Sequence, residues 1–115
     1  MTLGEKQRLF VRLVGELIDY AYVSGYELSF GDAYRDPRLA ALNAAQGSGI
    51  TNSLHCERLA VDFNLFKDGT WLTSTDAHLP LGNYWKTLHP LCCWGGDFIK
   101  RKDGNHYGIT HNGIK

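Results

Sequence analysis

The sequence has no long apolar run and no excess of charge of either sign. Of its 115 residues, 43% are hydrophobic and 21% are charged, and 12 Lys and Arg balance 12 Asp and Glu. No stretch approaches the roughly 20 apolar residues that span a membrane, and no basic field favours nucleic acid. We therefore expect neither membrane insertion nor a nucleic-acid partner. The length fits one compact domain over residues 1–115.

The chain also has few cysteines and lacks the features of a secretory leader. Cys56, Cys92 and Cys93 are odd in number and show no Cys-x-x-Cys spacing, although Cys56 lies beside His55 and could join the other two in a zinc cluster. We favour small buried thiols in a reducing compartment. Residues 1–12 are amphipathic and charged, unlike a signal peptide. We therefore expect a cytoplasmic product that leaves the cell, if at all, by another route.

Periodicity and turn residues predict a small α+β domain. Thr2 and Glu5 form the pattern of a capping box, and apolar residues then recur at helical spacing up to an expected stop at Gly25. Antiparallel strands with helices on one face are the architecture that the remaining pattern favours. The expected helices are 2–24, 36–45 and 76–89, the expected strands are 26–30, 59–66, 70–72 and 106–110, and the expected loops are 46–53, 94–98 and 101–105.

The strand expected over residues 59–66 carries an acidic residue in its middle. Its odd-numbered positions are apolar, whereas Ala60, Asp62 and Asn64 form a small, polar face. A carboxylate there is costly to bury unless a cation pairs with it or the face is wet. The spacing does not decide between these explanations.

Two further groups of residues offer partners for this carboxylate. His55 precedes the strand closely enough to fold back, and Asp103 and His106 lie close together near the end of the chain. Two histidines and one carboxylate make a ligand set that can hold a catalytic zinc with one position left for water. From spacing alone, solvated loop residues remain the default interpretation.

Several motifs together resemble the D-alanyl-D-alanine metallopeptidase family. Its members include vancomycin-resistance dipeptidases and carboxypeptidases, and phage endolysins that cut the L-alanyl–D-glutamate bond, to which the likeness is greatest. The likeness runs in order over about residues 26–109. SLHCERLAVDFNLF (53–66) is similar to the family's Ser-x-His-x-x-Gly-x-Ala-x-Asp signature, and DGNH (103–106) is similar to its second signature. AYRD (33–36) is similar to the segment that carries a substrate-binding arginine, and WGGDF (94–98) is similar to the phage members.

The resemblance implies roles for six residues. Three of them would bind zinc, one would be the general base, and two would contact substrate. The implied zinc ligands are His55, Asp62 and His106, the implied base is Asp103, Arg35 would bind a substrate carboxylate or the developing oxyanion, and Ser53 would contact substrate or support a ligand.

The resemblance also implies a hedgehog/D-Ala-D-Ala-peptidase-like fold and a function. We expect a zinc peptidase that cuts peptidoglycan stem peptides as an L-Ala-D-Glu endopeptidase. A monomeric phage or prophage endolysin that waits in the host bacterial cytoplasm and acts on the cell wall after release fits this reading. The alternatives are a D-alanyl-D-alanine carboxypeptidase of the same family, and a non-catalytic peptidoglycan-binding domain of the same fold.

Two departures and several rival residues qualify the resemblance. Arg58 stands where the signature has Gly, and Gly108 stands where many relatives place an acidic residue. Asp97 is a weaker rival of Asp103, and Arg38 a weaker rival of Arg35. We interpret the remaining residues as follows: His78, His89 and His111 as surface or capping residues, Trp71, Trp85 and Trp94 as core, and Lys100, Arg101 and Lys102 as a solvated turn.

Overall fold

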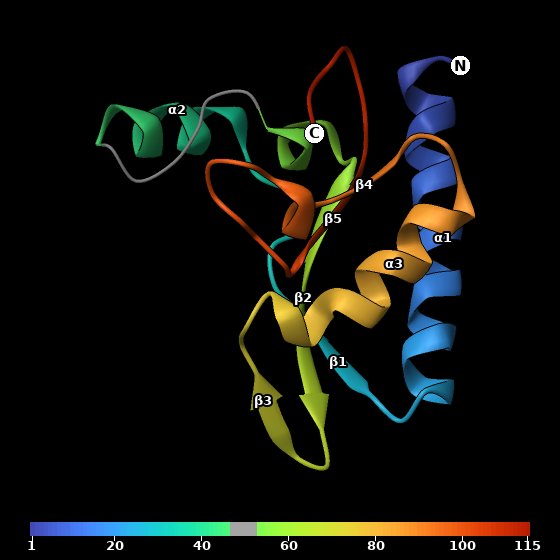
Figure 1. Cartoon of the computed structure of the whole chain (residues 1–115). Helices are drawn as coiled ribbons and strands as arrows, with labels where there is room; N and C mark the ends of the chain where they lie inside the picture. Colours follow the sequence, from blue (N-terminus) through green and yellow to red (C-terminus); the bar gives the residue numbers. More distant parts are fainter. Residues whose placement is uncertain (47–52) are drawn as a thin grey trace.

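The computed structural model describes residues 1–46 and 53–115 (Figure 1). Most of the loop expected at 46–53 therefore lies outside the described residues. Three short 3-10 helices accompany the main elements, at Leu54–Glu57, Asp76–His78 and Gly95–Asp97. The main elements are α1 (Leu3–Val23), β1 (Glu27–Phe30), α2 (Pro37–Ala45), β2 (Ala60–Lys67), β3 (Thr70–Leu72), α3 (Leu79–Leu88), β4 (Cys92–Trp94) and β5 (His106–Ile109).

The strands form one antiparallel sheet with β2 at its centre. Its order is β1-β2-β5-β4, and β3 pairs with β2 as the second arm of a hairpin. Figure 1 shows α1 and α3 together on one side of the sheet, with α2 apart from them. The α+β class with helices packed on one face is thus confirmed for α1 and α3. Within the described residues, no helix is long and apolar enough to cross a membrane.

Local sequence explains where the first elements begin and end. The Thr2 hydroxyl accepts a hydrogen bond from the Glu5 backbone, and the Glu5 carboxylate accepts one from the Thr2 backbone, so the capping box is confirmed. Gly25 follows α1 with a φ of 89°, in the left-handed region that glycine adopts at little cost. In the β2–β3 hairpin, Asp68 and Gly69 both have positive φ, as a two-residue type I′ turn requires.

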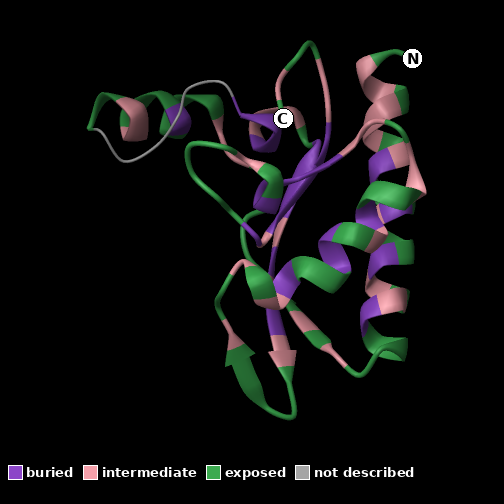
Figure 2. Cartoon of the chain, in the orientation of Figure 1, coloured by how far each residue is buried: buried purple, intermediate pink, exposed green. Residues whose placement is uncertain are grey.

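The core lies between the two helices and the sheet. Figure 2 shows buried residues along β2 and β5 and on the facing sides of α1 and α3. On β2, Val61, Phe63 and Leu65 are nearly inaccessible, which confirms the predicted apolar face. The Trp85 indole N–H donates to the carbonyls of Cys93 and Gly108, which ties α3 to β4 and β5. This packing makes β2 and β5 a rigid base for side chains on the opposite face.

Two predicted elements need correction. Residues 94–98 are not simply a loop, because Trp94 ends strand β4 and Gly95–Asp97 form a 3-10 turn. A three-residue strand shows no alternation, and only its pairing with β5 defines it. The expected helix 76–89 begins as the 3-10 turn Asp76–His78 and becomes α-helical at Leu79.

Candidate metal centre

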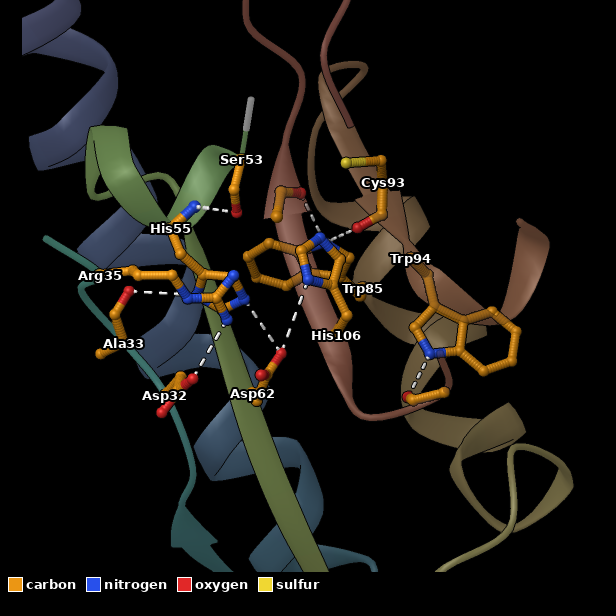
Figure 3. Close-up of polar contacts among 12 residues, drawn as sticks. Asp32, Ala33, Arg35, Ser53, His55, Asp62, Trp85, Cys93, Trp94 and His106 are labelled. Carbon is orange, nitrogen blue, oxygen red and sulfur yellow. Dashed lines mark hydrogen bonds and ion pairs between the residues drawn. The ribbon is translucent and has the colours of Figure 1, made fainter. Parts of the chain in front are cut away.

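The pairing of β2 with β5 brings two of the predicted ligands together. Asp62 is the cross-strand partner of His106, and His55 reaches the same point from the 3-10 turn that precedes β2. Asp62 Oδ1 lies 3.3 Å from His55 Nε2 and 3.5 Å from His106 Nδ1 (Figure 3). One ligand atom from each residue lies within 4.8 Å of the others. Both imidazoles are buried, with 3% and 5% exposed.

The spacing of the ligand atoms, and the lack of a hydrogen-bond partner for the Asp62 oxygen, fit a zinc ion. Tetrahedral zinc with bonds of about 2.1 Å separates its ligand atoms by about 3.4 Å, close to the two distances that Asp62 makes. Asp62 Oδ1 is buried without a hydrogen-bond partner among the described residues, which is costly for a carboxylate unless a cation lies there. His55 Nδ1 lies 3.3 Å from the Ala33 carbonyl, the kind of outer contact that orients a ligating histidine.

The charges within this cluster support one another. Burial alone would raise the pKa of Asp62, but the neighbouring His106 and His55 imidazoles outweigh it and lower that pKa to about 2. Burial opposes protonation of His55, yet the Asp62 carboxylate raises the pKa of His55 on balance. The cluster is therefore built around a permanent negative charge at neutral pH, which favours a cation between the imidazoles.

The turn that carries His55 is held by Ser53 and by the unexpected Arg58. The buried Ser53 hydroxyl accepts a hydrogen bond from the His55 backbone at 3.2 Å, so Ser53 orients this turn whatever its contact with substrate. Arg58 adopts the left-handed conformation with a φ of 58°, which explains why Gly is suited to the position. Its guanidinium lies 4.0 Å above the centre of the Tyr34 ring. A cation–π contact thus offsets part of the backbone strain.

Gly108 leaves one ligand without the outer partner that an acidic side chain could supply. His106 Nε2 is buried and has no hydrogen-bond partner among the described residues. A Cβ atom at Gly108 would lie 3.4 Å from that nitrogen. A side chain at position 108 would therefore start beside the unpaired nitrogen. The strand pairing of His106 places its ring opposite Asp62.

The loop that carries Asp103 is anchored by the WGG motif. The Trp94 indole N–H donates to the Gly104 carbonyl at 2.7 Å, and the Asp103 backbone N–H donates to Gly95 at 2.9 Å. A Cβ at Gly95 would collide with the Asp103 carbonyl, so only glycine allows this approach. Gly96 is packed equally closely against the Trp94 ring. This scaffolding role of the motif was not foreseen from the sequence.

Asp103 is electrostatically coupled to the cluster, whereas its rival Asp97 is engaged elsewhere. Burial raises the pKa of Asp103, and the negative charge of Asp62 raises it further. The Asp97 carboxylate instead forms an ion pair with Lys86 at 2.8 Å. This electrostatic coupling therefore favours Asp103 over Asp97 as the carboxylate associated with the cluster.

Arg35 also lies beside the cluster, and Arg38 does not. The Arg35 backbone N–H donates to the His55 carbonyl at 3.2 Å, and its guanidinium pairs with Asp32 at 3.1 Å (Figure 3). Its positive charge acts on the His55 imidazole. The Arg38 side chain is 93% exposed and pairs with Asp36, as expected for a solvated residue.

One histidine and one tryptophan do not behave as predicted. His78 is buried rather than on the surface, and its Nδ1 lies 2.8 Å from the Tyr107 hydroxyl. His111 contacts the Lys6 ammonium at 3.0 Å. His89 caps its own segment as expected, because its ring accepts a hydrogen bond from the Leu91 backbone. Trp71 is 60% exposed and is not part of the core. No sequence periodicity signals a buried histidine in a three-residue turn.

The cysteines take no part in the cluster. All three thiols are free, and Cys93 is buried whereas Cys56 and Cys92 are partly buried. Burial raises the pKa of Cys92 to about 12 and also raises that of Cys93. Thiols that stay protonated are poor metal ligands, which supports the interpretation of small buried thiols.

Comparison with known proteins identifies the family. A family model described as D-alanyl-D-alanine carboxypeptidase matches residues 46–109, which is more than half of the chain. The chain belongs to this family. The matched range contains the whole His55, Asp62, Asp103 and His106 set, whereas Arg35 lies outside it. The family resemblance inferred from the motifs is thereby confirmed.

A solved structure shares the fold of nearly the whole chain. The Serratia marcescens L-Ala D-Glu endopeptidase ChiX superposes with a TM-score of 0.75. The two sequences are 21% identical, and the alignment covers 93% of this chain and 85% of the other. No curated protein matches the chain. The superposition therefore supports the architecture of this family member.

Proposed function

We propose that this chain is a zinc-dependent endopeptidase that cleaves the L-Ala–D-Glu bond of peptidoglycan stem peptides. The observation that carries the proposal is the buried, unbonded Asp62 oxygen between two imidazoles. Family membership supports peptide-bond hydrolysis, and the fold shared with an L-Ala D-Glu endopeptidase supports the choice of bond. The WGGDF motif supports the further proposal of a phage or prophage endolysin that works as a single domain.

Zinc would be held by His55 Nε2, Asp62 Oδ1 and His106 Nδ1. When bound, zinc supplies a Lewis acid and lowers the pKa of a bound water toward roughly 7. The three residues orient this centre through the His55–Ala33 contact and the β2–β5 pairing. Because the β2–β5 pairing joins backbone atoms of two strands, it sets the positions of Asp62 and His106 before any ion binds, and the Ala33 carbonyl orients the His55 ring.

Asp103 moves the proton in this proposal. Its carboxylate accepts a proton from the attacking water and then returns it to the amine that leaves. The anchoring of its loop by Trp94 and Gly95 keeps it beside the cluster. Arg35 places a permanent positive charge next to His55, where it stabilises negative charge on the reacting carbonyl oxygen or on a substrate carboxylate.

The description of the family favours a second candidate, a D-alanyl-D-alanine carboxypeptidase. Digestion of purified peptidoglycan, followed by mass spectrometry of the fragments, separates the two. Endopeptidase action yields stem fragments with a new amino-terminal D-Glu, whereas carboxypeptidase action releases free D-Ala. Exclusive release of D-Ala would overturn the endopeptidase assignment. Absence of both products with the zinc-loaded protein would favour a non-catalytic binding domain.

A further inference from the structure

A polar cavity lies beside the loop that carries Asp103. It has a volume of about 190 Å³ and lies between the β2–β3 hairpin and the loop that precedes β5. That volume equals about six waters at roughly 30 Å³ each, enough for a small polar group. The residues of its wall that matter here are Asn64, Trp71, Thr75, His78, Lys102 and Asp103.

His78 is a buried polar group that presents one ring nitrogen to this cavity. Only 2% of the residue is exposed. Its Nδ1 is bonded to Tyr107, and no described residue bonds its Nε2. Among the described residues, the fully buried side-chain atoms without a partner are Asp62 Oδ1 and His106 Nε2. His78 Nε2 is not one of them, so it is not fully enclosed. The nitrogen is therefore reached from the cavity that the ring helps to line.

The Tyr107 contact determines what that nitrogen offers. Among the described residues, the buried Tyr107 hydroxyl has no acceptor other than His78 Nδ1, and a buried hydroxyl without an acceptor is costly. The hydroxyl therefore donates to Nδ1, and the neutral ring carries its proton on Nε2. Burial lowers the pKa of His78 to about 4, so the ring stays neutral at pH 7 and acts as a hydrogen-bond donor.

The cavity combines this donor with a positive charge. Lys102 lines it, and the Lys102 ammonium donates a 3.2 Å hydrogen bond to the Gly96 carbonyl. The Asn64 side chain, whose Nδ2 also donates to the Ser29 hydroxyl at 3.2 Å, adds an amide, and Trp71 adds an exposed ring. The Asp103 carboxylate also lines the cavity. Such a set of donors suits a carboxylate attached to a small residue.

We propose that this cavity is the subsite for the carboxylate of the residue whose amine leaves during cleavage, bound by Lys102 and by His78 Nε2–H. The inference rests on the proposed function, because Asp103 lines the cavity and also returns the proton to the leaving amine. For an L-Ala–D-Glu bond, the α-carboxylate of D-Glu sits on the carbon that bears this amine. Arg35, which lies on the His55 side, is then available to stabilise the oxyanion.

Binding of a product tests the subsite without turnover. We would titrate ¹⁵N-labelled, zinc-loaded protein with D-glutamate and with D-isoglutamine, whose α-carboxylate is an amide, and follow the ring nitrogens of His78 and Trp71. D-Glutamate should shift both signals and bind roughly 10- to 100-fold more tightly than the amide, the range for a hydrogen bond to a charged group. Equal affinity, or no shift at His78, would overturn the proposal.

Variants separate binding from folding. Lys102→Gln should remove most of the preference for the carboxylate over the amide. His78→Asn should do the same, because its amide can still face Tyr107 but does not reach the Nε2 position. His78→Gln, which keeps a donor near Nε2, should retain more of it, and Lys100→Gln, outside the cavity wall, should retain all of it. If Lys102→Gln kept the full preference for D-glutamate over D-isoglutamine, the proposed subsite would be contradicted, even if both His78 variants failed to fold.

Turnover of matched peptides distinguishes this inference from the proposed function. Stem peptides with D-Glu and with D-isoglutamine should differ mainly in KM for the wild type, and this difference should shrink in Lys102→Gln. Equal cleavage of both peptides would overturn the proposed subsite but not the proposed peptidase activity. No cleavage of either peptide, with D-glutamate still bound through Lys102 and His78, would support the subsite and overturn the proposed function.

Discussion

Two buried histidine sites contact neighbouring residues of β5 and have opposite electrostatics. In the first, His55 and His106 flank the Asp62 carboxylate, and the pKa of His55 is raised. In the second, His78 pairs with the Tyr107 phenol, and burial lowers the pKa of His78 to about 4. Because both sites are buried, burial cannot explain the difference.

The partner of each imidazole decides what the site can do. A carboxylate between two imidazoles leaves negative charge that a cation must balance, whereas a phenol satisfies one neutral imidazole and leaves a single N–H. His106 and Tyr107 are neighbours on β5, so the alternation of the strand separates the two environments. The following predictions test or refine this contrast, from the largest expected effect to the smallest.

Loss of Asp103 should affect the reaction more than any other change outside the zinc ligands. Asp103→Asn should keep fold and zinc but lower kcat by about 10²- to 10⁴-fold, because proton transfer is removed. Asp97→Asn is the matched control and should remain near wild type, since Asp97 pairs with Lys86. Rates on a defined stem peptide provide the measurement. A crippled Asp97→Asn with a normal Asp103→Asn would reverse the assignment.

Arg35→Ala should lower the rate by about 10²- to 10³-fold, the typical loss when one donor to an oxyanion is removed. Arg35→Lys should rescue poorly if the contact is bidentate, because an ammonium lacks the guanidinium fork. Zinc content should not change in either variant. Arg38→Ala serves as the control because that side chain is exposed. If Arg38→Ala alone were impaired, the AYRDPR segment would be misaligned by three residues.

His78 should make the stability of the protein depend on pH. Its pKa is about 4 when folded and about 6.5 when unfolded, so the unfolded state binds the proton first. The free energy of unfolding should therefore fall as the pH drops from 6.5 to 4, by up to about 1.4 kcal/mol per unit. Urea unfolding of zinc-free wild type and His78→Gln at several pH values should show that the free energy of unfolding depends less steeply on pH in the variant. Equal slopes would contradict a neutral buried ring.

Arg58 should show the smallest effect, on the turn that positions His55. Arg58→Ala loses the contact with Tyr34 but keeps the left-handed strain, so it should destabilise the protein by about 0.5–1 kcal/mol. Arg58→Gly also loses the contact but relieves the strain, and should stay closer to wild type. Thermal unfolding of both variants checks the order. A less stable Arg58→Gly would show that the backbone at position 58 is not strained.

The sequence predicts those parts of the fold whose signals are local. The Thr2 and Glu5 capping box and the alternation along β2 act over a few residues, and both are confirmed. Strand β4 was missed, because only its pairing with β5 makes it a strand. Long-range pairing of such short segments has no local signature.

The candidate site divides in the same way. His55, Asp62 and His106 were recognisable because a strand with an isolated carboxylate is anomalous and the family motifs surround it, and the structure brings the three together. The buried His78 was misread as a surface residue, since its partner Tyr107 is 29 positions away. The roles of Ser53, Arg35 and Asp103 remain predictions that geometry supports.

Zinc content is the most direct test of the central claim that Asp62 and its two imidazoles form a metal centre. Elemental analysis of protein refolded with zinc should give about one ion per chain. His55→Ala and His106→Ala should lose it, whereas His78→Gln should keep it, because only the first two rings contact the carboxylate. Full zinc occupancy in both His55→Ala and His106→Ala would place the ion elsewhere, with the cysteines as the next candidates.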